Sequence, residues 1–287
     1  ADAVKFQTYI TEKRIQDPTS PLRPLLKKFE LTYKDFEEIK IFSQELNIEF
    51  FSTAFDIEAI EFLSGIGIDL FKVASFDTSN SDLFEALIGK AKRIIFSTGM
   101  TEIATVSKLV DKIKSQVEAL GVLHCVSSYP TPASEARLSN ISLLRETFDG
   151  VVIGYSDHTQ GSEVSIGAVA LGAKVIEKHF TLDKSQKGPD HASSLEPHEF
   201  KELVSSIRNI SASLGDNEKK PSESELKNLF FVRKSIVSSQ VIKKGEVFSE
   251  SNITCKRPAG GISPMKWDMI LGTKAKKSYQ PNEYIEI

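Results

Sequence analysis

With 287 residues, of which 40% are hydrophobic and 26% charged, the chain is long enough for one large domain or for one large and one small domain of ordinary globular composition. A formal net charge of −3 argues against nucleic acid as a partner, and the absence of a long apolar run or a signal-peptide pattern argues against membrane association. Two cysteines, Cys125 and Cys255, suggest no disulfide framework, so we expect a cytoplasmic protein.

Short apolar runs alternate with helical patterns from the N-terminus to about residue 213. Apolar residues at helical spacing, such as Val106, Leu109, Val110 and Ile113, separate most of the runs. The runs predict seven strands, at residues 3–7, 48–52, 70–74, 93–97, 122–126, 151–153 and 175–179. This alternation predicts a parallel sheet covered by helices. Seven strands are one fewer than a (β/α)8 barrel contains.

A polar residue stands at the C-terminal end of nearly every predicted strand. Hydroxyl residues alone would be explained as strand ends and helix caps. That explanation does not cover Lys5, Lys72, His158 and His179 together. Polar residues from many strands meet at the C-terminal rim of a barrel, and the glycine-rich turn of an open dinucleotide-binding sheet is absent. The sequence therefore predicts a TIM-type barrel.

Two histidines follow the last two predicted strands. His158 ends the segment Gly154-Tyr155-Ser156-Asp157-His158-Thr159, and His179 ends Glu177-Lys178-His179. Ser156 and Glu177 precede them by two residues and should point to the same side, because side chains in a strand alternate. Each histidine taken alone is more simply a hydrogen-bonded core residue. Taken together, they predict a site for one metal ion, whereas Lys178 should point away from it.

The chain changes character after the barrel. Residues 196–213 have the pattern of a last helix, with Phe200, Leu203 and Val204 on one face. The expected domains are the barrel at residues 1–214, a polar linker at 215–232, and a small, mostly β module at 233–287. Fewer than sixty residues make such a module marginally stable alone.

Motifs along almost the whole chain, in a fixed order, resemble those of the sialic acid synthases, which make N-acetylneuraminic, legionaminic and pseudaminic acids. The resemblance is carried by Lys5-Phe6-Gln7, Phe71-Lys72-Val73-Ala74-Ser75, Ser97-Thr98-Gly99-Met100, Ser128-Tyr129-Pro130-Thr131-Pro132, the two histidine segments and Gly188-Pro189-Asp190-His191. Lys256-Arg257-Pro258, Gly260-Gly261 and Leu271-Gly272 resemble the family's C-terminal antifreeze-like (SAF) domain.

The resemblance implies a condensation of phosphoenolpyruvate with an open-chain N-acetylmannosamine-type sugar, giving a nonulosonic acid and phosphate. It implies that His158 and His179 hold Mn²⁺ or Mg²⁺ and belong, with Glu177 and Asp190, to the catalytic groups. Phosphoenolpyruvate is expected to be bound by residues that carry an amine or a hydroxyl: Lys5, Thr53, Lys72, Ser75, Ser97, Ser127 and Ser156. Lysines and hydroxyl donors suit a phosphate and a carboxylate, since they replace the water that both groups lose.

The same resemblance places five residues around the sugar: Gln7, Asp77, Tyr129, Phe231 and Arg257. Arg257 corresponds to an arginine that one subunit sends into the barrel of the other, which implies a domain-swapped homodimer. Two roles stay open from the residues themselves. Glu177 is either a structural partner of Lys72 or a base beside the metal, and Asp190 either contacts the sugar or only stabilises a turn after Gly188-Pro189.

Members of the resembled family begin with a further strand and helix that bear an acidic residue. We therefore expect the first β/α unit to be missing from this chain and catalysis to be impaired. The alternatives are a metal-dependent barrel hydrolase and a non-catalytic carbohydrate- or ice-binding protein. Residues 71–77 and 193–197 weakly favour the legionaminic or pseudaminic branch, but the sequence decides neither the amino sugar nor the metal.

Overall fold

The computed structural model describes residues 1–188, 190–216 and 218–287, which form two compact units, Ala1–Gly215 and Asp216–Ile287. Pro189 of the predicted Gly188-Pro189 turn and Asn217 of the predicted linker lie outside the described residues. Among the residues described, no helix is both long enough and apolar enough to cross a membrane.

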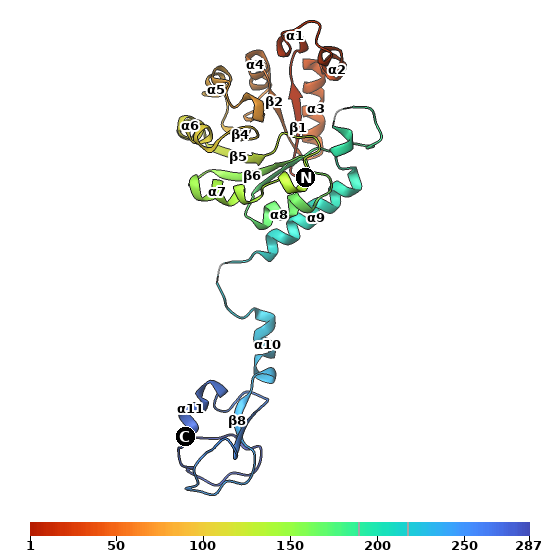
Figure 1. Cartoon of the computed structure of the whole chain (residues 1–287). Helices are drawn as coiled ribbons and strands as arrows, with labels where there is room; N and C mark the ends of the chain where they lie inside the picture. Colours follow the sequence, from red (N-terminus) through yellow and green to blue (C-terminus); the bar gives the residue numbers. More distant parts are fainter. Residues whose placement is uncertain (189, 217) are drawn as a thin grey trace. The chain divides into compact units, whose positions relative to one another are not determined.

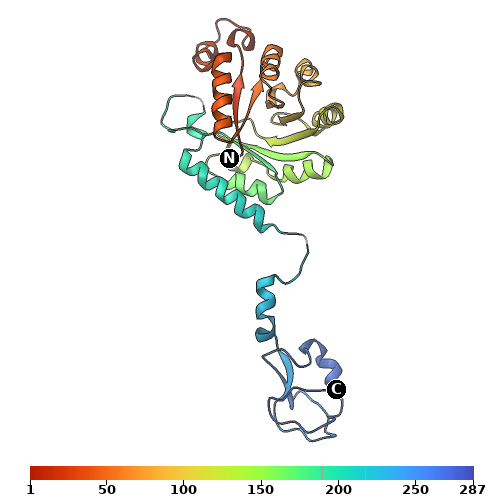
Figure 2. The same ribbon diagram turned by 180° about the vertical axis from the view of Figure 1, so that it is seen from behind.

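The first unit is built on one parallel sheet, and the predicted alternation of strands and helices is confirmed. Its strands are β1 (Ala3–Thr8), β2 (Glu49–Ala54), β3 (Leu70–Val73), β4 (Arg93–Ser97), β5 (Ala119–Cys125), β6 (Val152–Asp157) and β7 (Val175–Lys178). They are hydrogen-bonded in sequence order, so β1 and β7 are the two edges of this sheet in the described chain. Figures 1 and 2 show the curled sheet with the helices on its outside.

The helices lie between successive strands, as parallel pairing requires, except the last, which follows β7. They are α1 (Thr11–Arg14), α2 (Leu22–Phe29), α3 (Tyr33–Glu45), α4 (Ile57–Gly65), α5 (Ser81–Leu87), α6 (Ile103–Ile113), α7 (Ser139–Thr147), α8 (Glu163–Ala170) and α9 (Pro197–Ser213). Short 3₁₀ turns, η1 (Ser75–Asp77), η2 (Lys114–Gln116), η3 (Ala133–Glu135) and η4 (His191–Ser193), lie between them. The apolar helix faces pack on the outer face of the sheet in one core that includes Phe36, Leu63, Phe84 and Ile141.

The alternation of strand side chains separates this core from the interior of the curled sheet. In β3, Phe71 and Val73 belong to the outer core, while Lys72 between them reaches Ser97 on β4. The side chain of Lys178 on β7 is buried on the helix side, where it pairs with Asp157 at 2.9 Å, and Ser165 of α8 donates to the same carboxylate. Lys178 thus points away from the interior, as its position in the strand predicts.

Strand β6 is longer than the three apolar residues that the sequence predicts. It extends through Gly154 to Asp157, so the polar motif begins on the strand itself. A Cβ atom at Gly154 would lie 2.4 Å from the Val175 carbonyl oxygen and 2.5 Å from Leu123 Cδ2. Glycine therefore permits the close approach of β5 and β7 on either side of β6.

The second unit begins with helix α10 (Glu223–Val232) and continues with β8 (Ser235–Ser238), β9 (Ile253–Lys256), η5 (Pro264–Lys266) and α11 (Trp267–Ile270). Strands β8 and β9 pair antiparallel, and their unit has its own buried core, including Ile236, Phe248, Ile270 and Tyr279. Residues 223–232 were expected to be part of a linker, but they form a helix. Its start is fixed by a capping box between Ser222 and Glu225.

Candidate active site

The candidate active site is lined by the inward-facing side chains at the C-terminal ends of the strands. Lys5, Lys72 and Glu177 come from β1, β3 and β7 and meet in the interior of the sheet. Lys72 Nζ lies 3.3 Å from Glu177 Oε2, and Lys5 Nζ lies 3.8 Å from Glu177 Oε1. Because β1 and β7 are the two edges of the sheet, the second contact shows how far the sheet has curled.

The charged groups of this cluster shift one another's pKa values. Burial raises the pKa of Glu177, but the ammonium groups of Lys72 and Lys5 outweigh burial and bring that pKa to about 2. Burial lowers the pKa of Lys5; the Glu177 carboxylate opposes this effect and Lys72 adds to it. The interior thus holds two amines and one carboxylate, an arrangement that attracts a further anion.

Hydroxyl groups surround the two lysines. Lys72 Nζ donates to Ser97 Oγ at 2.6 Å, Lys5 Nζ donates to Thr53 Oγ1 at 3.4 Å, and Ser156 Oγ donates to Glu177 Oε1 at 3.4 Å. The side chains of Lys72, Ser97, Thr53 and Ser156 are all nearly fully buried. These residues were predicted to bind phosphoenolpyruvate, and the fold brings them together.

Ser75 and Ser127 approach each other across Gly99. The Gly99 amide donates to Ser75 Oγ at 3.0 Å. A Cβ atom at Gly99 would lie 2.3 Å from Ser127 Oγ and 2.9 Å from Ser75 Oγ, so only glycine leaves room for both hydroxyls. The sequence motif Ser97-Thr98-Gly99-Met100 contained Gly99, but no role for this residue was predicted.

His158 and His179 lie side by side, with their ring centroids 5.3 Å apart. The ring of Tyr129 lies 4.1 Å from that of His158 and 6.0 Å from that of His179. His158 Nδ1 donates to the Val126 carbonyl oxygen at 2.9 Å, because a carbonyl can only accept. In the neutral ring this leaves the Nε2 lone pair available for a metal or a proton.

The two rings differ in electrostatic environment. Burial lowers the pKa of His179 to about 4, despite the nearby Asp190 carboxylate. Burial also acts to lower the pKa of His158, but the contacts with the Cys125 thiol and the Val126 carbonyl outweigh it and raise the pKa. His179 is therefore neutral at neutral pH, as a metal ligand must be.

The residues fit a metal ion held by two imidazoles. Asp190 Oδ2 lies 3.9 Å from His179 Nδ1. Within residues 1–188, 190–216 and 218–287, no three His, Cys, Asp or Glu side chains are arranged to hold a metal ion. Two neighbouring imidazoles are donors that suit a divalent ion, and the metal site at His158 and His179 stays a prediction.

The residues expected around the sugar are divided between the two units. Gln7 on β1, Asp77 in η1, Tyr129 after β5 and Asp190 before η4 belong to the first unit. Phe231 of α10 and Arg257 after β9 belong to the second unit, and both are exposed. The predicted roles of these residues, and the sugar contact that was left open for Asp190, remain predictions.

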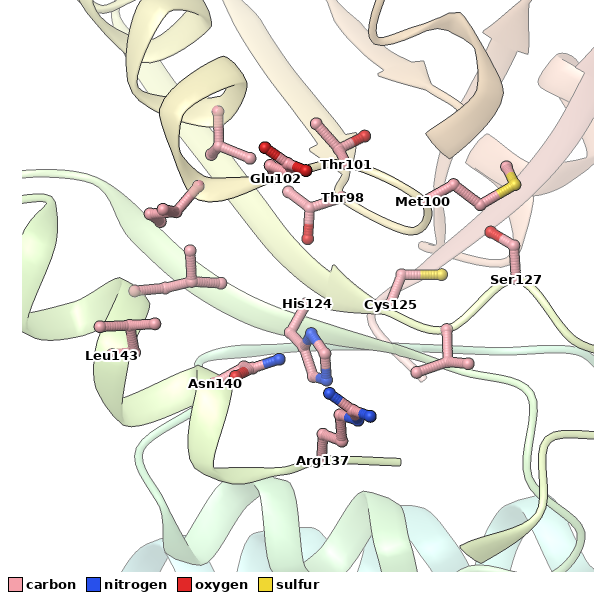
Figure 3. Close-up of a pocket in the computed structure, with 14 residues that line it drawn as sticks. Thr98, Met100, Thr101, Glu102, His124, Cys125, Ser127, Arg137, Asn140 and Leu143 are labelled. Carbon is pink, nitrogen blue, oxygen red and sulfur yellow. The ribbon is translucent and has the colours of Figure 1, made fainter. Parts of the chain in front are cut away.

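A cavity of about 510 Å³ lies between the segments that follow β4 and β5 (Figure 3). Cys125 and Ser127 line it on the side of Met100, while His124 and Asn140 line its other part together with Arg137. Neither His158 nor His179 is among the described residues that line it. The cavity therefore borders the candidate site through Ser127 but does not contain its reaction centre.

Comparison with known proteins shows which family models and which named proteins the chain resembles. Residues 1–219 match the model of the NeuB family, and residues 233–286 match that of the SAF domain. The chain is 41% identical to the N,N'-diacetyllegionaminic acid synthase of Campylobacter jejuni, with 99% of this chain and 90% of that protein aligned. It is 38% identical to the pseudaminic acid synthase of Campylobacter jejuni strain 81-176, with 98% and 85% aligned.

A solved structure agrees with these matches. The crystal structure of N-acetylneuraminic acid synthetase from Leptospira borgpetersenii in complex with citrate superposes with a TM-score of 0.75 at 37% identity, over 79% of each chain. The predicted fold class, a TIM-type barrel followed by a small SAF domain, is thereby confirmed. The chain belongs to the NeuB family.

Proposed function

We propose that the protein is a nonulosonic acid synthase that condenses phosphoenolpyruvate with the open-chain form of an N-acetylated amino sugar. The observation that carries the proposal is the cluster of Lys5, Lys72 and Glu177 beside the paired rings of His158 and His179. The phosphate and the carboxylate of phosphoenolpyruvate suit the two lysines, and the aldehyde of the sugar suits a metal ion held by the two histidines. The condensation needs these two groups of residues next to each other. The chain's relatives bear names of synthases of this class.

In this proposal the lysines and hydroxyls bind phosphoenolpyruvate. Lys72, Lys5 and the hydroxyls of Ser97, Thr53 and Ser156 donate to its phosphate and carboxylate oxygens, and the charge-assisted hydrogen bonds offset the lost hydration. Ser75 and Ser127 add donors on the side of Gly99. Glu177 holds the two ammonium groups in position and keeps them from repelling each other before the substrate arrives.

The reaction forms a bond between carbon 3 of phosphoenolpyruvate and the aldehyde carbon of the sugar. Water then adds to carbon 2, and phosphate leaves with cleavage of the carbon–oxygen bond. His158 and His179 would hold a divalent ion, Mn²⁺ or Mg²⁺, that polarises the aldehyde oxygen. The Val126 carbonyl orients His158 by holding its Nδ1 proton, which keeps Nε2 directed to the site.

We also propose that the active form is a homodimer in which Arg257 of one subunit reaches the sugar bound by the other. Phe231 and Arg257 belong to the second unit, separated in sequence from the barrel that carries the remaining site residues. We assign the protein to the cytoplasm, where phosphoenolpyruvate is made. The class of the enzyme is a transferase that forms a carbon–carbon bond.

Phosphate release tests the proposal. The protein is incubated with Mn²⁺, phosphoenolpyruvate and a panel of N-acetylated and 2,4-diacetamido hexoses, and phosphate is measured. We expect release only when both substrates are present. Release from phosphoenolpyruvate alone would favour a hydrolase, and no release with any sugar would contradict the proposal.

A further inference from the structure

An ion pair between Asp157 and Lys178 is buried on the helix side of the sheet, directly behind the two histidines. Lys178 Nζ lies 2.9 Å from Asp157 Oδ2, and both side chains are almost completely buried. The two residues are also the last pair in register between β6 and β7. Each is followed in the sequence by one of the histidines, His158 or His179. The ion pair therefore joins the two strands at the point where both histidine loops begin.

Asp157 fixes the turn of the chain around His158. Its Oδ1 accepts hydrogen bonds from the amide and from the hydroxyl of Thr159, both at 2.8 Å, which is the local pattern of an Asx turn. Its Oδ2 accepts from Ser165 Oγ at 2.5 Å in addition to Lys178. Ser165 belongs to α8, the helix between β6 and β7. One buried carboxylate thus holds the backbone after His158, the helix and the neighbouring strand.

Lys178 contacts the chain on both sides of His158. Its ammonium group donates to the Asp157 carboxylate and to the Thr159 carbonyl oxygen, which belong to the residues before and after that histidine. Because successive side chains of a strand alternate, the ring of His179 lies on the opposite face from the Lys178 side chain. The ammonium group therefore ties the backbone from which His179 projects to the loop that carries His158.

Stability alone is a poor explanation for two charges at this position. Both groups lose their hydration when they are buried, and apolar side chains of similar volume often give equal or greater stability. Apolar side chains do not supply direction, however, whereas hydrogen bonds restrict the angles between the groups that they join. The two imidazoles, with ring centroids 5.3 Å apart, need fixed directions if they are to bind one ion. The ion pair is suited to provide this geometry.

We propose that Asp157 and Lys178 are positioning residues that set the mutual geometry of the two histidines and thereby the affinity of the site for a divalent ion. The inference rests on the proposed function, in which His158 and His179 hold the ion, and it adds two residues that act through them. Both side chains lie on the helix side of the sheet, beside Ser165 of α8. Their effect therefore passes through the backbone of the histidine loops and not through contact with the ion or a substrate.

The test titrates Mn²⁺ into the full wild-type chain, Lys178→Met and Asp157→Asn without substrates, and follows free and bound Mn²⁺ by electron paramagnetic resonance. Either substitution should weaken Mn²⁺ binding by about 10- to 100-fold, because the ligands are no longer held in place. The KM for phosphoenolpyruvate at saturating Mn²⁺ should change by less than about twofold. Each titration is made well below the unfolding temperature of the variant, where a loss of stability alone does not change the affinity of the folded protein.

Two further variants separate positioning from stability. The double variant Asp157→Leu/Lys178→Met leaves no buried charge unpaired, so it should be more stable than Lys178→Met and serves in its place if that variant does not fold. Its Mn²⁺ affinity should stay low, because the hydrogen bonds to Thr159 are lost. Lys90→Met is the matched control. It breaks a more exposed ion pair with Glu61, 2.6 Å between charged atoms, and should bind Mn²⁺ as the wild type does.

The outcomes distinguish this inference from the proposed function. Wild-type Mn²⁺ affinity in folded Lys178→Met and Asp157→Asn would overturn the inference and leave the synthase function standing. A double variant that regains both stability and Mn²⁺ affinity would do the same, because the ion pair would then serve stability only. A wild type that binds no Mn²⁺ would overturn the inference together with the metal site of the proposed function. Weakened Mn²⁺ binding in the variants, with no turnover of any sugar by the wild type, would support the inference and contradict the synthase function.

Discussion

Lys72 and Glu177 form an ion pair with 3.3 Å between Nζ and Oε2, although three strands separate β3 from β7 in the sheet. The pair can form only because the sheet curls until these two strands face each other across the interior. The side chain of Lys72 is 3% exposed and that of Glu177 20% exposed. This contact therefore depends both on the curl of the sheet and on the charges of the site.

Replacing Glu177 by Gln should destabilise the protein by roughly 3 kcal/mol near neutral pH, because the buried Lys72 loses its counter-charge. The folded-state pKa of Glu177, about 2, lies below the 4.5 of an ordinary glutamate. Its stabilisation is complete above the unfolded pKa and is lost as the pH falls from 4.5 toward 2. About 1.4 kcal/mol should disappear by a pH of about 3.5.

Urea unfolding of the wild type and of Glu177→Gln at neutral pH and near pH 3.5 measures this effect. The difference between the two proteins should shrink at the lower pH. A difference that is the same at both pH values would show that folding does not lower the pKa of Glu177.

Replacing Lys72 by Ala should raise the KM for phosphoenolpyruvate by about 100-fold or more, because a buried charge-assisted contact worth about 3 kcal/mol is lost. Lys72→Arg should recover little, since the space beside Ser97 Oγ, 2.6 Å from Nζ, is fitted to a compact ammonium. Initial rates at varied phosphoenolpyruvate check both variants. An unchanged KM in Lys72→Ala would remove Lys72 from the binding site.

Replacing Gly99 by Ala should weaken phosphoenolpyruvate binding by about tenfold. The new methyl group must displace Ser127 Oγ and Ser75 Oγ, which would lie 2.3 and 2.9 Å away. The matched control is Gly65→Ala at the end of α4, where no atom lies within 4 Å of the added Cβ. Titration calorimetry with phosphoenolpyruvate should separate the two variants, and equal affinities would contradict the assigned role of Gly99.

Replacing either His158 or His179 by Ala should abolish specific Mn²⁺ binding and lower turnover by about 10³-fold or more. His198→Ala is the control, because that ring is 71% exposed and lies outside the pair. Electron paramagnetic resonance of Mn²⁺ titrated into each variant measures the binding directly. A variant without His158 and His179 that binds Mn²⁺ as the wild type does would place the metal elsewhere.

The sequence predicted the barrel well because the strands are short, apolar and regularly spaced. The run at residues 70–73, for example, is buried on both faces, and this makes it stand out from the helices around it. The alternation rule also assigned Lys72 and Lys178 to opposite faces correctly. The end of β6 was missed because Gly154 and the polar residues after it are typical of a turn.

The helix α10 was missed because the polar residues before it are typical of a linker. The capping box of Ser222 and Glu225 was the available signal, and Leu226, Phe230 and Phe231 follow it at helical spacing. The role of Glu177 as a partner of Lys72 was one of two interpretations that the sequence allowed, and its contact with Lys5 was not predicted. Only the distance between Lys72 Nζ and Glu177 Oε2 favours the ion pair, and this distance could not be predicted because it depends on the curl of the sheet.

Contacts of backbone atoms, and the space left where a glycine has no Cβ atom, could not be predicted from residue types. The Val126 carbonyl fixes the tautomer of His158, and the missing Cβ of Gly99 makes room for two hydroxyls. The aromatic rings around Arg14 were equally hidden, since Tyr9, Phe55 and Phe76 come from three segments of the chain. Such relationships are properties of the folded chain.

The central claim is tested most directly by following [2-¹³C]phosphoenolpyruvate by NMR in the presence of Mn²⁺, the protein and each N-acetylated or 2,4-diacetamido hexose of the panel. The proposed synthase should convert the labelled enol carbon into the anomeric carbon of a nonulosonic acid, only when the sugar is present. Conversion of the label into the carbonyl carbon of pyruvate, with or without the sugar, would show hydrolysis and contradict the account.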